Sequence, residues 1–180
     1  MLVLILIKNL SYKSFIENKE KLNFSFLFQK IRSGLPNLAR FNKKIILNDG
    51  LPTELIAAGF ESSKIIQNKD ILILNKTSDL NISDIYQQIN EIVNCFTNKC
   101  KNTNFVIVST EGEKDPGTIT GGGVQDKDIN LPVIFAGPYF ESKKIEDKFY
   151  TINDVAITIN SFYNEFIENK RGKKINFIKN

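Results

Sequence analysis

The sequence predicts an α/β fold, a three-layer sandwich built around a mainly parallel sheet. The prediction comes from four short apolar runs, which are Leu2–Ile7, Ile71–Leu74, Phe105–Val108 and Pro132–Ala136. None of these runs alternates with polar residues, which is typical of strands that are covered on both faces. Segments with helical spacing separate the runs, and strands that alternate with helices favour a parallel sheet.

Local signals predict the elements of the first half in order. After the strand at Leu2–Ile7, a helical stretch with Leu22, Phe26 and Ile31 stops at Gly34. Lys43–Leu47 is predicted as a short strand. Asn48-Asp49-Gly50 then turns the chain into a helix that has Pro52 near its first turn and ends before Gly59.

The second half contains the clearest helix, from about Ser83 to Asn98. Its apolar residues Ile85, Ile89, Ile92 and Phe96 recur at four, three and four residues and form one stripe. Thr110–Asn130 is a long polar loop, and loops of this length are usually functional or disordered. Asn153 is predicted to cap a final helix, and Ile175–Ile178 to add an edge strand.

Length and composition set the limits on function. With 180 residues and no composition break or linker, we expect one domain over residues 1–180. The chain contains no histidine, which excludes histidine as a general base, a metal ligand or a pH switch. The net charge of +4 comes from 24 basic and 20 acidic residues scattered along the chain.

Three smaller features have mainly structural explanations. The basic cluster Lys170, Arg171, Lys173 and Lys174 fits a solvated helix end better than a phosphate or nucleic-acid contact. Cys95 and Cys100 lack the spacing of a redox or metal motif, and reduced structural thiols favour a cytoplasmic location. The apolar run at the start is too short to span a membrane, and no transmembrane segment is expected.

Polar residues follow the predicted strands, at the edge where open α/β sheets bind their ligands. They are Lys8 and Asn9, Asn48 and Asp49, Asn75 to Asp79, and Ser109 to Glu111. Polar residues also follow the strands of sheets that bind nothing, so position alone does not define a site. Gly121-Gly122-Gly123 could hold an anion with its backbone amides, but it lacks the Gly-Lys-Ser/Thr end of a phosphate-binding loop.

The segment from Phe105 to Ile159 carries a family resemblance. It contains Phe-Val-Ile-Val-Ser-Thr-Glu-Gly, then Thr-Gly-Gly-Gly, then Leu-Pro-Val-Ile-Phe-Ala-Gly-Pro, and finally Thr-Ile-Asn-Asp-Val-Ala. In order and spacing this resembles the C-terminal half of the alkaline phosphatase superfamily, which includes sulfatases and nucleotide pyrophosphatase/phosphodiesterases. There, a strand ends in Ser/Thr-Asp-His-Gly, a Gly-His-Gly-Gly loop follows, and a Pro-led strand ends in Gly-Pro before an Asp-Ile-Ala-Pro-Thr helix start. The resemblance implies an alkaline-phosphatase-like core.

The departures from the family pattern bear on function. The family's two-metal site uses Asp and His ligands, and the resemblance puts its first aspartate at Lys8 or Asn9 and its nucleophile near Asp49 or Gly50. Asp79 matches a ligand aspartate, whereas Ser83 stands in place of a histidine. Thr110 and Glu111 replace the Asp-His pair, and Gly121 replaces the loop histidine. An ammonium at Lys8 would also repel a dication.

The sequence therefore predicts a catalytically inactive alkaline phosphatase/sulfatase-like domain that acts in binding or assembly. Its degenerate pocket would include Asn9, Asp49, Thr110 and Gly121, with no cofactor expected. The alternative is a minimal phosphoester or sulfate ester hydrolase that binds Mg²⁺ or Mn²⁺ through Asp79 and Glu111, with Asp49 a further carboxylate. A third interpretation is an unrelated doubly wound nucleotide-binding module. Expected partners are a protein or an anionic small molecule, with no specific nucleic acid, and the oligomeric state stays open.

Overall fold

The computed structural model describes residues 1–7, 10–33, 71–75, 82–109, 112, 125–162 and 172–179, and for strand 71–75 the backbone alone. The strands are β1 (Leu2–Ile7), β2 (Phe26–Arg32), β3 (Ile71–Asn75), β4 (Asn104–Ser109), β5 (Asn130–Ala136), β6 (Lys143–Ile145), β7 (Tyr150–Thr151) and β8 (Phe177–Lys179). The helices are α1 (Tyr12–Asn18), the 3-10 turn η1 (Lys19–Lys21), α4 (Ile82–Lys99), α5 (Asp126–Ile129) and α6 (Ile152–Ser161).

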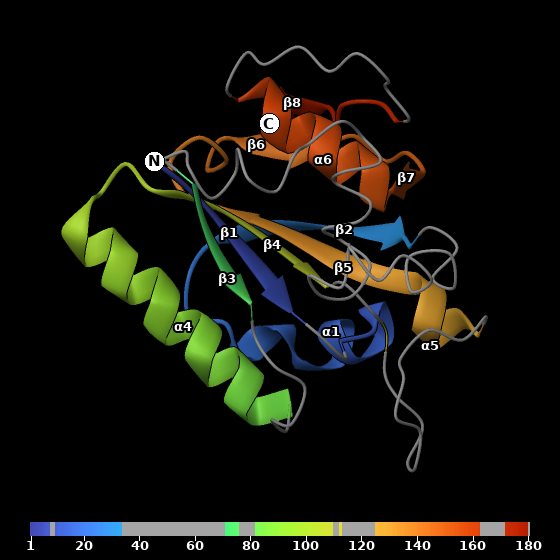
Figure 1. Cartoon of the computed structure of the whole chain (residues 1–180), viewed down its shortest axis with the longest axis horizontal. Coiled ribbons are helices and arrows are strands. Elements are labelled where there is room, and N and C mark those ends of the chain that lie inside the picture. Colours follow the sequence, from blue (N-terminus) through green and yellow to red (C-terminus); the bar gives the residue numbers. More distant parts are fainter. Residues whose placement is uncertain are drawn as a thin grey trace, which may run out of the picture.

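The described strands form a mainly parallel sheet in the order β3-β1-β4-β5-β2-β7 (Figure 1). β1 pairs in parallel with both β3 and β4, and β2 pairs in parallel with β7. β5 is antiparallel to its two neighbours, β4 and β2, so it alone runs against the other strands of this described sheet. The prediction of a mixed α/β fold with a mainly parallel sheet is confirmed.

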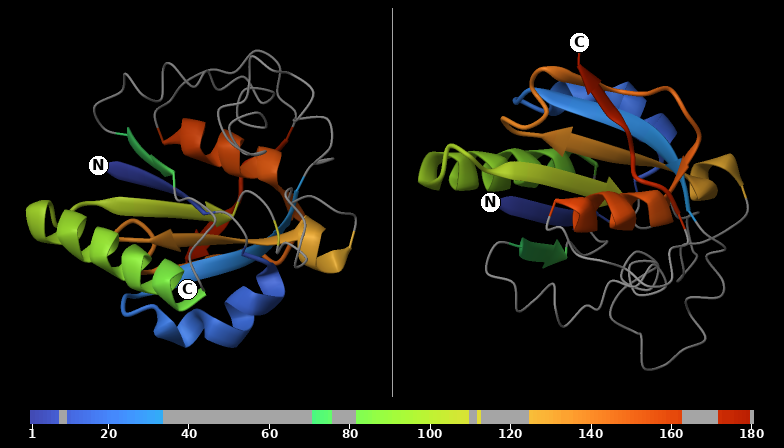
Figure 2. Two further views of the ribbon diagram at one scale, coloured as in Figure 1. Left: turned by 60° about the horizontal axis from the view of Figure 1, so that its bottom comes forward. Right: turned by 90° about the horizontal axis from the view of Figure 1, so that it is seen from above.

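Both faces of the sheet are covered, as the unbroken apolar run of β1 predicts. Leu2 and Leu4 belong to one buried cluster, with residues of α6. Val3 and Ile5 belong to the other, with residues of α1 and α4. Figure 2 shows α1 and α4 on one face and α6 on the opposite face. A strand with two buried faces has no polar face, which is why β1 shows no alternation.

The first helix is shorter than predicted, because the stretch through Phe26 and Ile31 is the strand β2 and not a helix. Phe24, Phe26 and Phe28 recur at every second residue and pack with the α1 cluster, whereas Leu27 and Ile31 pack on the other face. This two-residue period is that of a strand. α1 begins after Ser11, whose Oγ accepts a hydrogen bond from the backbone N–H of Ser14 at 3.1 Å.

α4 confirms the helix predicted from about Ser83 to Asn98. Ile85, Ile89 and Val93 are buried against the sheet, at the spacing of one helical face. Ile92 and Phe96, predicted on the same stripe, are half-buried at its margin. The strands predicted at Ile71–Leu74, Phe105–Val108 and Pro132–Ala136 are also present, with one or two more residues each.

The C-terminal elements differ from the sequence prediction in two details. α6 begins at Ile152, so Asn153 lies inside its first turn and is not the cap. Instead, the Oδ2 of Asp154 accepts a hydrogen bond from the backbone N–H of Thr151 at 2.6 Å. The predicted edge strand at Ile175–Ile178 is β8, which pairs antiparallel with β6 in a separate two-stranded sheet, called here the C-terminal ribbon.

Other predictions fall wholly or partly outside the described residues. The strand at Lys43–Leu47 and the helix between Gly50 and Gly59 lie outside them. Of the predicted loop at Thr110–Asn130, the described part holds Gly112 and the helix α5. Cys95 and Cys100 are free thiols, and both are exposed. Among the described helices, none is both long and apolar enough to cross a bilayer.

Candidate functional site

Three parallel strands end side by side at the edge where the sequence predicts a site. Leu6 of β1 is level with Asn75 of β3, and Ile7 of β1 is level with Ser109 of β4. Since parallel strands share a direction, the chain leaves all three strands at the same edge of the sheet (Figure 1). β1 is the middle strand of the three, so Lys8 and Asn9 follow the central strand end in the sequence.

The exit of β4 is packed against the short helix before β5. Ser109 and Gly112 are both buried, and a Cβ on Gly112 would overlap the carbonyl oxygen of Lys127 and the Cα of Asp128. Glycine is therefore required for this close approach of two backbones. Gly112 is the glycine that aligns with the Ser/Thr-Asp-His-Gly strand end of the family pattern.

Asp128 is a buried carboxylate at this same point, and its role there is structural. It is 7% exposed, and its Oδ2 accepts a hydrogen bond from the backbone N–H of Gln125 at 3.0 Å. The backbone N–H of Asp128 in turn donates to the carbonyl oxygen of Gln125 at 2.9 Å. These two bonds close the first turn of α5, on which Gly112 packs.

The residues predicted for the pocket lie outside the described part of the chain. They are Asn9, Asp49, Thr110 and Gly121, together with the predicted metal ligands Asp79 and Glu111. Lys8 also lies outside it. The structure thus describes the strand ends that lead into Asn9, Asp79 and Glu111, but not these side chains. Within the described ranges, no three Asp, Glu, Cys or His side chains gather at a point that could bind a metal ion.

Ser83, which stands where the family pattern has a histidine, is described and exposed. It lines an open groove of about 500 Å³ between α4 and the chain after η1. Asn90 bridges this groove: its Oδ1 accepts from the backbone N–H of Asn23 at 3.1 Å, and its Nδ2 donates to the carbonyl oxygen of Lys21 at 2.8 Å. The hydrogen bonds of Asn90 across this groove therefore attach α4 to η1 and the segment that follows it.

Tyr86 lies behind the same groove and is 1% exposed. Its hydroxyl donates to the carbonyl oxygen of Phe15 at 3.5 Å, and burial raises the pKa of the phenol above its usual value. A phenol in this state is neutral at physiological pH, so Tyr86 fits a structural role and not that of a catalytic base.

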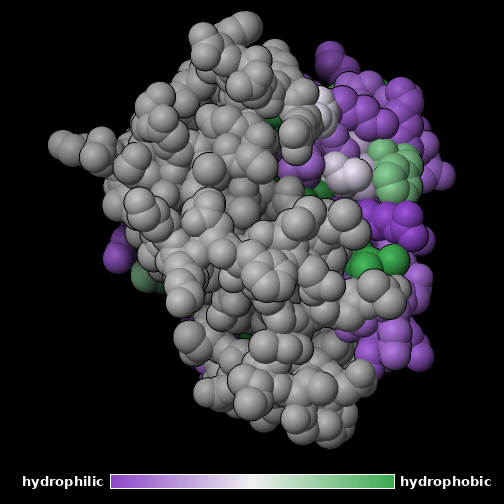
Figure 3. All heavy atoms as spheres, turned by 45° about the vertical axis from the view of Figure 1, so that its right-hand side comes forward, coloured by the Kyte–Doolittle hydropathy of each residue, from purple (hydrophilic) through white to green (hydrophobic). Residues whose placement is uncertain are grey.

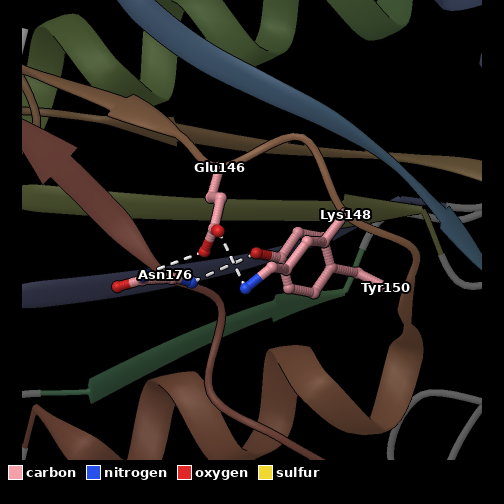
Figure 4. A network of polar contacts seen from close by, with 4 residues as sticks. All are labelled: Glu146, Lys148, Tyr150 and Asn176. Atoms are coloured by element: carbon pink, nitrogen blue, oxygen red, sulfur yellow. Dashed lines mark hydrogen bonds and ion pairs between the residues drawn. The ribbon is translucent and has the colours of Figure 1, made fainter.

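The other end of the sheet carries a second polar network, between the segment before β7 and the C-terminal ribbon (Figure 4). Lys148 Nζ lies 2.8 Å from Glu146 Oε1, and Asn176 Nδ2 donates to Glu146 Oε2 at 2.9 Å. The backbone N–H of Asn176 also donates to the Tyr150 hydroxyl at 3.4 Å. The bonds from Lys148 and Asn176 hold the pKa of Glu146 below its ordinary value, and the bond to Glu146 raises the pKa of Lys148.

Asp154 connects the same segments from inside the molecule. It is 3% exposed, and its Oδ2 accepts from the backbone N–H and the hydroxyl of Thr151. Its Oδ1 accepts from the backbone N–H of Lys173 at 2.6 Å. Asp154 is the aspartate that follows Thr-Ile-Asn in the segment resembling the family's last helix start, and here its carboxylate is occupied by backbone donors.

A hollow of about 240 Å³ lies at the edge formed by β2 and β7. Arg32, Lys148 and Phe149 are among the residues that line it, and sequence reasoning did not select any of them. The available signal was the run Asp147-Lys148-Phe149-Tyr150, in which a basic residue precedes two aromatic ones. Comparisons of the chain with protein-family models, with curated proteins and with solved structures gave no match.

Proposed function

We propose that the chain is a catalytically inactive domain of the alkaline phosphatase/sulfatase type, with that family's three-layer core, and that it acts by binding an anionic ligand. The observation that carries the proposal is the parallel arrangement of β3, β1 and β4, which end together at one edge. The segments that the resemblance assigns to the pocket follow these strand ends in the sequence. The proposed ligand site is therefore at this edge.

The element boundaries support the resemblance. β4 ends at Ser109, where the family motif begins, and Gly112 packs tightly on α5. β5 ends at Ala136, directly before Gly137-Pro138, and Gly137 has a φ of +108° that side chains rarely adopt. Both glycines thus meet a backbone requirement at positions that the family pattern also reserves for glycine.

The residue types at this edge support binding over catalysis. The chain has no histidine, and Lys8 or Asn9 stands where the resemblance expects an anionic ligand for a metal ion. An ammonium group close to a divalent cation is unfavourable, whereas the same group attracts a phosphate or a sulfate. Lys8 follows the central strand of the three in the sequence, and we propose it as the contact for such an anion.

The first experiment asks whether the protein turns over an ester. The purified chain is incubated with nitrophenyl phosphate, its diester and the sulfate, each with Mg²⁺, Mn²⁺ or Zn²⁺ present. We expect no turnover above the metal-only background. Turnover that is lost in Asp79→Ala and in Glu111→Ala would replace this proposal with the carboxylate-dependent hydrolase.

The second experiment asks whether the edge binds an anion. Phosphate and sulfate are titrated while the melting temperature is followed, because a ligand that binds only the folded state raises it. We expect an increase for the wild type that is lost in Lys8→Gln and retained in Lys99→Gln, a lysine on the exposed end of α4. The same melting temperature at every concentration of either anion would exclude the anionic ligand and leave a protein partner to be sought.

A further inference from the structure

The positive charge of the chain is concentrated on one part of its surface. Residues 30–32, 143–150 and 172–179 contain eight basic and two acidic side chains, whereas the rest of the sequence has 16 basic and 18 acidic residues. The first two segments meet at the β2–β7 edge, and the third lies beside them through the pairing of β6 with β8. The whole excess of positive charge therefore lies on the β2–β7 edge and the C-terminal ribbon.

Three cations around this edge face aromatic rings. Arg32 Cζ lies 5.9 Å from the ring centre of Phe149, Lys173 Nζ lies 5.3 Å from that of Tyr150, and Lys30 Nζ lies 5.9 Å from that of Tyr12. Within the described ranges, none of the three forms an ion pair with a carboxylate, whereas Lys148 is paired with Glu146. The charge of Lys173 helps to lower the pKa of Glu146 across a longer distance, but none of the three cations is held in a direct ion pair with a described residue, so they remain able to contact an anionic ligand.

Phe149 is the most exposed large hydrophobic side chain described, with 63% of its surface accessible. A single exposed apolar residue is ordinary on a protein surface. Phe149, however, lines the 240 Å³ hollow together with Arg32 and Lys148. Asp147 is the acidic residue that lines it. An exposed ring next to a guanidinium group and an ammonium group has the composition of a platform on which a nucleic-acid base stacks.

The C-terminal ribbon extends the basic surface beyond this hollow. In the register of β6 and β8, Lys143 is directly opposite Lys179, and like charges in that position destabilise a strand pair. Lys144 on β6 and Lys174 in the preceding segment are both exposed. Lys143 and Lys144 lie on opposite faces of the ribbon, because successive residues of a strand alternate, and Lys143 Nζ lies over the ring of Tyr139. The basic surface thus extends beyond one pocket, which fits a ligand with repeated negative charges. In Figure 3 the described part of the visible face is mainly hydrophilic, with isolated hydrophobic side chains.

We propose that the β2–β7 edge and the C-terminal ribbon bind single-stranded nucleic acid without sequence preference. Arg32, Lys173 and the lysines of one face of the ribbon contact phosphates, and Phe149 stacks on a base. A single strand is favoured over a duplex because its bases are free to stack on an exposed ring. This site contains no residue of the edge at β3, β1 and β4, so the proposal stands independently of the anion site above.

The test is fluorescence anisotropy with a labelled 20-residue oligothymidine over a series of salt concentrations. We expect the logarithm of the affinity to fall linearly with the logarithm of salt. Arg32→Gln with Lys173→Gln removes two phosphate contacts, so the slope should become shallower by about 1.4, at about 0.7 for each contact with a single strand. Phe149→Ala should weaken binding by about tenfold or more and leave the slope unchanged.

The matched control removes two charges elsewhere, through Lys99→Gln with Lys101→Gln at the exposed end of α4. It should change the slope far less than the Arg32 and Lys173 pair does. An equal effect of both pairs would reduce the binding to general charge attraction and overturn the proposal. Equal competition by duplex DNA or by polyphosphate, or an unchanged affinity in Phe149→Ala, would overturn the stacking role and hence the single-strand assignment. Melting curves for each variant establish that it is folded.

Discussion

The two halves of the sheet differ in strand direction and in the burial of their side chains. In the half formed by β3, β1 and β4, the described pairs are parallel, and the described side chains of β1 are buried on both faces. In the half formed by β5, β2 and β7, the pairing is mixed, and most of β2 is half-buried or exposed. The first half is a buried core whose strand ends form the proposed ligand edge, and the second carries the exposed cations and aromatic rings.

This difference shows how one sheet can combine two proposed activities. A ligand edge on parallel strands requires fully buried strands, because helices must cover both faces to complete the fold. A surface for a long anionic ligand requires an accessible strand edge instead. β5, the strand that runs against its described neighbours, joins the second half to the first by pairing with β4. We therefore expect the two regions to respond differently to mutation.

The largest effect on the free energy of unfolding is expected for a leucine-to-alanine substitution, which can be made in both halves of the sheet. Leu4 of β1 and Leu27 of β2 pack with the same hydrophobic cluster, but Leu4 is 0% exposed and Leu27 is half-buried. Leu4→Ala should lower the free energy of unfolding by about 2–5 kcal/mol, the range for a fully buried leucine. Leu27→Ala should cost about half as much, because less apolar surface is buried there. Urea unfolding measures both, and equal losses would show that β2 belongs to the buried core as much as β1 does.

The next largest effect on stability is expected from removing a hydrogen bond that Asp154 accepts in the second half. Asp154→Asn keeps the shape of the side chain but removes one of the carboxylate acceptors that bind the backbone N–H groups of Thr151 and Lys173. A buried donor that loses its acceptor costs about 1–3 kcal/mol. The exposed Asp147→Asn, the control, should change thermal stability by less than about 0.5 kcal/mol. If the two variants melt alike, Asp154 does not hold the C-terminal segment to α6.

The accuracy of the sequence predictions also differs between the two halves of the sheet. The runs of β1, β3, β4 and β5 and the stripe of α4 were predicted correctly, because burial on both faces or on one helical face leaves an unambiguous pattern. β2 was predicted as part of a helix through Leu22, Phe26 and Ile31, although the step of five residues from Phe26 to Ile31 departs from helical spacing. The alternation of Phe24, Phe26 and Phe28 was the better indicator, and it depends on which two faces the tertiary structure covers.

The candidate sites were predictable to different degrees. The edge at β3, β1 and β4 was expected from strand ends alone, because the carboxyl ends of parallel strands meet. The basic edge at β2 and β7 was not, because Arg32, Lys148 and Lys173 are far apart in the sequence. The pairing of β2 with β7, the packing of Lys173 on Tyr150 and the hydrogen bond from the backbone N–H of Lys173 to Asp154 bring them together. Composition gives the net charge, but the placement of that charge requires the fold.

The smallest expected effect is the pH dependence of the Glu146–Lys148 pair. The folded-state pKa of Glu146 lies below its ordinary 4.5, so the pair stabilises the folded state above that pH, and the stabilisation is lost as the pH falls through the lower folded-state value. Glu146→Gln should therefore be slightly less stable than the wild type near neutral pH and equal to it at an acidic pH where the carboxyl is protonated in both states. Because both partners are exposed to solvent and are screened by salt, the difference should also shrink in high salt.

Urea unfolding of wild type and variant at both pH values measures this difference in stability, and Glu141→Gln, an exposed carboxylate outside the network, is the control. If the difference in unfolding free energy between wild type and variant persists at the acidic pH, Glu146 stabilises the loop through its hydrogen bond with Asn176 or through packing, and not through its charge.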